Sequence, residues 1–191
     1  HMTWKQILST LALSVLLLSC TANTEATKQR LLESGNRYYE QGKYREAAIV
    51  YMRAIREDRR VGEAYYRLGL AELRLGRMVQ MVRAMQRAVE LQPENDDAFG
   101  LLSEVYISAY LLSPPSHSQK ILTDLRDLLE RAEKQNANSY EILRVKGYIA
   151  LADREYEKAH ESFRAAANIK PGDLKTTVAL IQTLILMDRS E

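Results

Sequence analysis

The sequence predicts an all-α protein, and three observations support this prediction. Alanine, leucine, glutamate and arginine, which favour helices, are frequent, whereas the alternating valine, isoleucine and threonine runs typical of strands are missing. Small residues recur at a fixed interval along the chain. Of the 191 residues, 27% are charged and 46% are hydrophobic, which is the composition of a globular protein rather than of a disordered one.

The first element is an apolar stretch near the N-terminus. Met2 follows His1, an order that no initiator methionine produces, so His1 is interpreted as a cloning remnant. After a lysine, residues 7–18 form an apolar run that is too short to cross a hydrocarbon core of about 30 Å as a helix. These features predict a signal peptide over residues 2–19, followed by a small, polar tether over residues 20–27.

The single cysteine of the chain, Cys20, comes directly after this apolar run. The preceding Leu17-Leu18-Ser19 resembles the bacterial lipobox, in which the cysteine carries diacylglycerol and becomes the first mature residue. An ordinary buried thiol is the alternative, but the position of the cysteine favours lipidation. We therefore expect a lipid-anchored protein of the bacterial cell envelope that faces the periplasm, without a choice between inner and outer membrane.

Two independent series of small residues mark an internal repeat. The first, Gly35, Gly69, Ser103 and Gly147, has steps of 34, 34 and 44 residues. The second, Ala54, Ala88, Ala132 and Ala166, has steps of 34, 44 and 34 residues. Both series place one insertion of ten residues in the third unit, since 44 − 34 = 10.

This pattern resembles the tetratricopeptide repeat, a pair of antiparallel helices whose small residues lie where the helices cross closely. The resemblance implies a right-handed α-solenoid of helix–turn–helix repeats. The predicted units are residues 28–61, residues 62–95, residues 96–139 with the insertion, residues 140–173, and residues 174–191 as the first helix of an incomplete fifth repeat or a cap.

The third and last units depart from the pattern. Pro114 and Pro115 must end the helix before them, and the insertion from Tyr110 to Ser118 is either an extra contact surface or a lengthened turn. In the last unit, apolar side chains spread over more than one helix face, which the end of a solenoid cannot leave uncovered. Either the sequence stops short of the natural end, which we favour, or another copy or a partner covers this helix.

Catalytic and cofactor sites find little support in the residues. His117 lies among serines in a predicted proline loop, and His160 has no second histidine at helical spacing, so we expect no metal site. Each glycine is explained by a helix crossing or a turn, so we expect no nucleotide or other cofactor. The net charge of +2 is spread along the chain and indicates no nucleic-acid surface. The prediction is a protein that is not an enzyme.

In the resembled family, the first helix of each unit lines a concave groove. By resemblance, the peptide-binding groove positions are Leu32, Asn36, Tyr39, Tyr66, Leu70, Leu73, Gly100, Glu104, Ile107, Arg144, Tyr148 and Leu151. Several of these tyrosines have an equal chance of packing inside the array instead. Family members that grip a C-terminal carboxylate use a lysine where this chain has Leu32, and an asparagine where it has Arg67, so we expect no chaperone-tail binding.

The leading hypothesis is therefore an envelope-anchored adaptor that binds a peptide or helix of a partner protein. Lipoproteins of this kind serve the assembly or export of a surface structure, such as a pilus, an outer-membrane protein or an exopolysaccharide/PEP-CTERM system, and the sequence does not choose among these. The alternatives are a structural scaffold that self-associates through the apolar C-terminal helix and an auxiliary cell-envelope enzyme.

Overall fold

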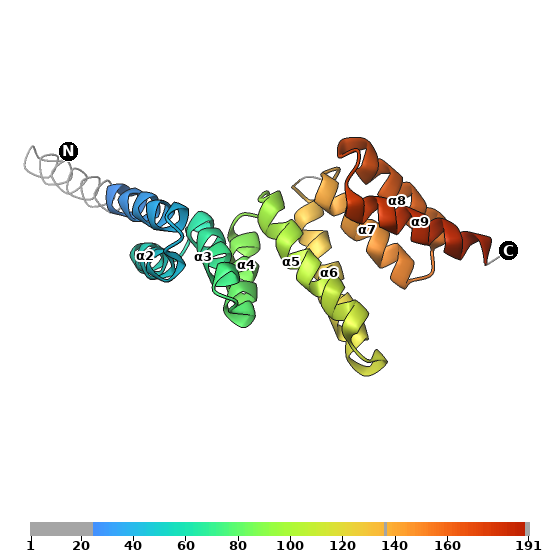
Figure 1. Ribbon diagram of the computed structural model, residues 1–191, viewed down its shortest axis with the longest axis horizontal. Coiled ribbons are helices and arrows are strands. Elements are labelled where there is room, and N and C mark those ends of the chain that lie inside the picture. Colours follow the sequence, from blue (N-terminus) through green and yellow to red (C-terminus); the bar gives the residue numbers. More distant parts are fainter. Residues whose placement is uncertain (1–24, 136, 190–191) are drawn as a thin grey trace, which may run out of the picture. The chain divides into compact units, whose positions relative to one another are not determined.

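The computed structural model describes residues 25–135 and 137–189, so the predicted signal peptide and Cys20 lie outside the described residues. Every regular element in the described part of the chain is an α-helix (Figure 1). The predicted all-α fold is thus confirmed. Within these residues, no helix combines the length and the apolar character needed to cross a membrane.

Helical hairpins follow one another along the chain. After the helical residues 25–40, the helices are α2 (Tyr44–Glu57), α3 (Gly62–Arg74), α4 (Met78–Leu91), α5 (Asp96–Leu112), α6 (Pro115–Glu133), α7 (Tyr140–Ala152), α8 (Tyr156–Ile169) and α9 (Leu174–Asp188). The chain divides into two compact units, with unit 1 extending to Arg87 and unit 2 beginning at Ala88. Helix α4 begins in unit 1 and ends in unit 2.

Gly35, Gly69 and Gly147 lie where two helices of a hairpin cross, and each faces one large side chain of the second helix. A Cβ atom at Gly69 would lie 2.6 Å from Met85 Cε, and one at Gly147 would lie 2.6 Å from Phe163 Cδ1. Such distances are shorter than van der Waals contact, so a larger residue would push the helices apart. The close crossings that the spacing predicts are therefore present in both units.

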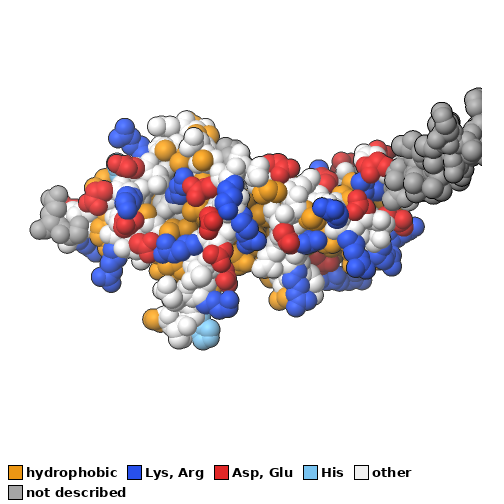
Figure 2. Space-filling view, turned by 180° about the vertical axis from the view of Figure 1, so that it is seen from behind, with side chains coloured by type: hydrophobic (Ala, Val, Ile, Leu, Met, Phe, Trp, Pro, Cys, Tyr) orange, Lys and Arg blue, Asp and Glu red, His pale blue; other side chains and the backbone are white. Residues whose placement is uncertain are grey.

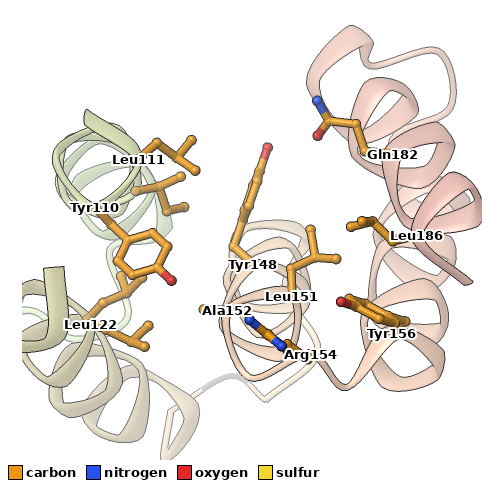
Figure 3. A pocket seen from close by; sticks show the side chains of 12 residues that line it. Tyr110, Leu111, Leu122, Tyr148, Leu151, Ala152, Arg154, Tyr156, Gln182 and Leu186 are labelled. Carbon is orange, nitrogen blue, oxygen red and sulfur yellow. The ribbon is translucent and has the colours of Figure 1, made fainter. Parts of the chain in front are cut away.

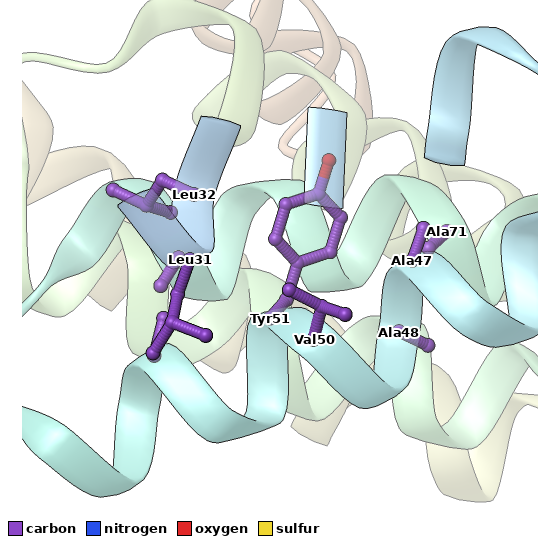
Figure 4. Packing of buried hydrophobic residues seen from close by; sticks show 9 residues of the cluster. Leu31, Leu32, Ala47, Ala48, Val50, Tyr51 and Ala71 are labelled. Carbon is purple, nitrogen blue, oxygen red and sulfur yellow. The ribbon is translucent and has the colours of Figure 1, made fainter. Parts of the chain in front are cut away.

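The core of unit 1 lies between the helical residues 25–40 and helices α2 and α3 (Figure 4). Tyr51 is fully buried there, and its ring packs against Gly35, with Cδ1 2.7 Å from the position of a glycine Cβ. The Tyr51 hydroxyl donates a 2.7 Å hydrogen bond to Asn36 Oδ1, and burial raises the pKa of Tyr51 to about 12. The phenol therefore stays neutral and fixes this crossing.

The structure differs from the sequence-based expectations at two helix starts. Residues 25–27, predicted as the end of a tether, are already helical, and Glu25 pairs with Lys28 at helical spacing. Helix α6 begins at Pro115, so His117 lies in its first turn rather than in a loop. The reason is that proline has no amide hydrogen to lose and its fixed φ suits the first helical position.

The ten-residue insertion in the third predicted repeat, residues 96–139, lengthens both helices of its hairpin. Helices α5 and α6 have 17 and 19 residues, against 13 and 14 in the preceding α3 and α4. As predicted from the prolines, α5 stops at Leu112, and Ser113 and Pro114 alone join it to α6. The insertion is therefore about one extra turn on each helix and not a loop.

Candidate functional site

A pocket of about 440 Å³ lies in unit 2 between the lengthened hairpin, α7 and α9. Figure 3 shows the α7 side chains between those of α5 on one side and those of α9 on the other. The lining residues are mostly apolar or aromatic: Ile107, Tyr110, Leu111, Leu122, Leu125, Tyr148, Leu151, Ala152, Arg154, Tyr156, Gln182 and Leu186. Pockets with this composition suit apolar side chains of a ligand, with a few polar groups that fix its orientation.

Three of the predicted groove positions meet in this pocket. Ile107 comes from α5, whereas Tyr148 and Leu151 come from α7. The Tyr148 ring stands edge-on to Phe163 with a centroid distance of 5.1 Å, so the crossing at Gly147 also orients the pocket tyrosine. Burial raises the pKa of Tyr148, which keeps its hydroxyl neutral.

Two other predicted positions, Glu104 and Arg144, are engaged in a charge network across α5, α7 and α9. Arg144 is only 3% exposed, and its guanidinium donates to Glu104 Oε2 and Glu141 Oε2, each at 2.9 Å. Lys175 Nζ lies 3.0 Å from Glu104 Oε1. Burial alone raises the pKa of Glu104, but the bonds from Lys175 and Arg144 outweigh this and lower it. The network joins the three helices that carry the pocket.

The predicted positions of unit 1 lie elsewhere. Leu32 belongs to the hydrophobic core and is 8% exposed, which leaves little surface for a ligand, and Asn36 accepts the hydrogen bond from Tyr51. Tyr39 stands edge-on to Tyr44 with a centroid distance of 5.1 Å. The three positions on α3 are half-buried: Tyr66, Leu70 and Leu73.

Sequence reasoning missed the contribution of the turn and of the last helix to the pocket. Arg154 follows Gly147 by seven residues, as Gly42 follows Gly35 and Gly76 follows Gly69, so the repeat register is the signal that singles it out. Gln182 and Leu186 come from α9, which the sequence presented only as an uncovered apolar helix. Tyr110 and Leu111 show that the insertion does supply pocket surface.

Candidate catalytic groups do not gather at this pocket. Ser116 Oγ lies 3.0 Å from His117 Nδ1, but both side chains are exposed in the first turn of α6 and line no pocket described here. Among the described residues, no group of three or more His, Cys, Asp and Glu is placed to hold a metal ion. Figure 2 shows basic and acidic side chains interspersed over the visible face.

Repeated helical hairpins with an apolar pocket among them define a helical-repeat protein of the kind that binds polypeptides. The family model of the tetratricopeptide repeat matches residues 32–96 and 126–173. The chain therefore belongs to the tetratricopeptide repeat family, whose members typically bind protein partners and are generally non-catalytic. No curated protein matches the sequence.

Solved structures share the fold at low sequence identity. The thermophilic tetratricopeptide protein TTC0263 of Thermus thermophilus is 24% identical, with a TM-score of 0.59 over 85% of this chain and 84% of that chain. MamA of Desulfovibrio magneticus RS-1 is 18% identical, with a TM-score of 0.62 over 85% and 86%. Pseudomonas aeruginosa pilF is 12% identical, with a TM-score of 0.62 over 87% and 72%.

Proposed function

We propose that this protein is a non-catalytic adaptor that binds a peptide or helical segment of a partner protein in the unit 2 pocket. The observation that carries the proposal is the pocket of about 440 Å³ with its apolar and tyrosine-rich lining. Tyrosine gives a large contact area at low cost in side-chain entropy and keeps a polar tip for hydrogen bonding. A surface of this kind favours a segment that alternates apolar and polar side chains.

The site is held in place before any partner arrives. Helices α5, α7 and α9 are joined by the network of Glu104, Arg144 and Lys175, and Tyr148 is oriented by Phe163. A preorganised surface loses less conformational entropy on binding than a flexible one. A rigid pocket of this kind suits binding. Its lining residues include no nucleophile paired with a base, no carboxylate pair and no cluster of metal ligands, so they do not support a catalytic role.

The cellular setting that we propose is the bacterial envelope, with Cys20 lipidated and the helical units facing the periplasm. The support comes from the sequence alone, namely the apolar run of residues 7–18 and the position of the cysteine after it. Assembly or export of a surface structure is the role we favour. Replacing Cys20 with alanine should abolish the incorporation of labelled palmitate and leave the signal peptide uncleaved, and undiminished labelling of the variant would exclude Cys20 as the lipid site.

A pull-down from solubilised membranes tests the adaptor proposal. The full chain is the bait, and a variant with Tyr148→Ala and Leu151→Ser removes two contacts of the pocket. We expect partner recovery to fall by about tenfold or more, because truncating central aromatic contacts commonly costs over 1 kcal/mol each. Tyr39→Ala in unit 1 is the matched control, which should retain the partner. Undiminished recovery with the pocket variant would discard the pocket as the binding site.

A second candidate function, self-association, is favoured by the surface of α9. Its apolar side chains are between 42% and 75% exposed: Leu174, Val178, Ile181, Leu184 and Ile185. A patch of this kind marks an interaction surface more often than a free surface. Light scattering of the full chain distinguishes the candidates, because a monomer at high concentration excludes the scaffold while leaving the adaptor intact.

A further inference from the structure

Three helical hairpins turn along the same backbone path. The turn residues Gly42, Gly76 and Arg154 have φ angles of 73°, 71° and 62°. At each turn this residue donates its amide hydrogen three residues back, and the next residue donates five residues back, as in Arg154 N to Leu151 O at 3.1 Å and Glu155 N to Ala150 O at 2.9 Å. These are the hydrogen bonds of a helix end that requires a left-handed residue.

Arginine is a costly choice for this conformation. A positive φ brings a Cβ atom close to the backbone, which glycine avoids. Among the described residues, Arg154 is the one non-glycine residue with positive φ. The turns at Gly42 and Gly76 follow the same backbone path without that cost. Strained residues of this kind concentrate at binding sites, where the side chain has a task of its own.

The Arg154 side chain lies at the pocket. It is the single charged residue among the lining residues, and it is exposed at the pocket edge (Figure 3). The acidic residues on either side already have partners, since Asp153 pairs with Arg126 at 2.5 Å and Glu155 pairs with Lys158 at 2.8 Å. Within the part of the chain that the structure describes, no acidic group pairs with Arg154. An apolar pocket with one unpaired cation at its edge is complementary to an apolar segment that carries a negative charge.

We propose that Arg154 selects partner segments in which an aspartate or glutamate side chain stands next to the apolar side chains that fill the pocket. This inference rests on the proposed binding function and names the chemistry of the partner. Arg154 is exposed at the edge of the pocket, which leaves room for a partner chain to continue past it. The proposal therefore assigns the charge to a side chain within the segment, and a terminal carboxylate is the alternative that the test separates. The guanidinium fork then binds the carboxylate in a bidentate manner.

The test uses a library of random 16-residue peptides, displayed with both ends blocked by flanking sequence. The full chain in phospholipid nanodiscs is the target, and empty nanodiscs remove background binders. The best peptides are measured by fluorescence anisotropy with the original chain, with Arg154→Gln, and with the control Arg164→Gln, an exposed arginine of α8 outside the pocket. Each acidic peptide is also made with its acid changed to the amide.

We expect selected peptides to be rich in apolar and acidic residues. Changing the peptide acid to its amide should weaken binding to the original chain by about three- to fivefold, the range of a partly exposed ion pair, and should have no effect with Arg154→Gln. Arg164→Gln should bind as the original chain does. Arg154→Gly should lose the same preference without a lower melting temperature, because the turn accepts glycine.

Binding without an acidic preference, or a preference that survives Arg154→Gln, would overturn the inference. Loss of this binding with Tyr148→Ala and Leu151→Ser would then show that the pocket remains the binding site. The inference also fails if tight binders come only from a parallel library whose peptides end in a free carboxylate. Selection of no peptide from either library above the empty nanodiscs would instead reject the pocket as a binding site, and the role of Arg154 with it.

Discussion

Units 1 and 2 use the same helix crossing but offer different surfaces. Gly35 packs against Tyr51 in unit 1 as Gly147 packs against Phe163 in unit 2, sixteen residues further along the chain in both cases. A hollow in unit 1 has about 210 Å³ and is lined by Ser34, Arg37, Tyr38 and Gln41, whereas the pocket of unit 2 has about 440 Å³ and a mostly apolar lining. The repeat pattern therefore sets the helix crossings and places Ile107, Tyr148 and Leu151, and the departures from the pattern add Tyr110, Leu111 and Arg154 to the pocket.

Helix starts show a second difference between the units. Asn95, Ser139 and Asp173 each accept a hydrogen bond from the amide three residues on, and so cap α5, α7 and α9. They are spaced by 44 and 34 residues, and 34 residues before Asn95 stands Val61, which cannot cap α3. Helices α5, α7 and α9, which carry pocket residues, thus have a side-chain cap at their N-termini, whereas α3 has none.

The largest effect is expected from removing the large partner of a crossing glycine. Phe163→Ala in unit 2 and Tyr51→Ala in unit 1 should each lower the free energy of unfolding by about 3–5 kcal/mol, because each empties a fully buried site. Because each helix packs mainly against its neighbours, Phe163→Ala should first lose hydrogen-exchange protection in α7, α8 and α9. Tyr51→Ala should first lose it in residues 25–40 and α2. Loss of protection over the whole chain in both variants would show that the units do not unfold separately.

A smaller effect is expected from breaking the charge network of Glu104, Arg144 and Lys175 in unit 2. Arg144→Met should lower the free energy of unfolding by about 2–3 kcal/mol, less than for a fully buried ion pair, because Glu104 and Glu141 keep partial access to water. Urea unfolding measures the change. The control Arg74→Met removes an exposed arginine of unit 1 that contacts Tyr44 and should unfold as the original chain does. Equal losses in both variants would rule out a special role for the network.

The smallest effect concerns the charge of the α9 cap. The hydrogen bond from the Thr176 amide lowers the pKa of Asp173 to about 2 from an ordinary 3.8. A carboxyl group whose pKa is lower in the folded state than in the unfolded state stabilises the fold at pH values above its unfolded-state pKa. For Asp173 this contribution disappears as the pH falls from about 4 to about 2. Asp173→Asn, which can still cap, should therefore be less stable than the original chain at pH 6, by under about 1 kcal/mol after solvent screening. Urea unfolding at both pH values should show the gap closing by pH 2; a constant gap would contradict the assignment.

Much of the fold was open to prediction because it depends on local chemistry. The steps between Gly35, Gly69, Ser103 and Gly147 predicted the hairpins, since a close crossing tolerates few side chains. The two prolines predicted that the helix before them ends, and α5 does end there, at Leu112. The length of α6 was missed because a proline pair suggests a loop, although Pro115 serves as the first residue of a helix.

The site was less accessible to sequence reasoning because it depends on which side chains find partners within the fold. The family resemblance predicted Asn36, Arg144 and Tyr148 alike as groove residues. In the structure, Asn36 is hydrogen-bonded by Tyr51, and Arg144 is bound by acidic residues. Such pairings join positions up to 40 residues apart, as between Glu104 and Arg144. A periodic pattern reports which helix face a residue occupies, but it does not report whether that residue is free to meet a ligand.

The two-residue connection between α5 and α6 is a site where the protein can be shortened or labelled. Ser113 and Pro114 join helices that are each about one turn longer than their predecessors, and Leu112 beside them is 86% exposed. Residues can be removed from the end of α5 and the start of α6 without rotating the rest of either helix, because the deletion lies at the tip of the hairpin. Shortening both helices by about one turn would thus remove Tyr110 and Leu111 from the pocket lining. A fluorophore attached at Ser113 would report ligand binding in the pocket without disturbing the hydrophobic core.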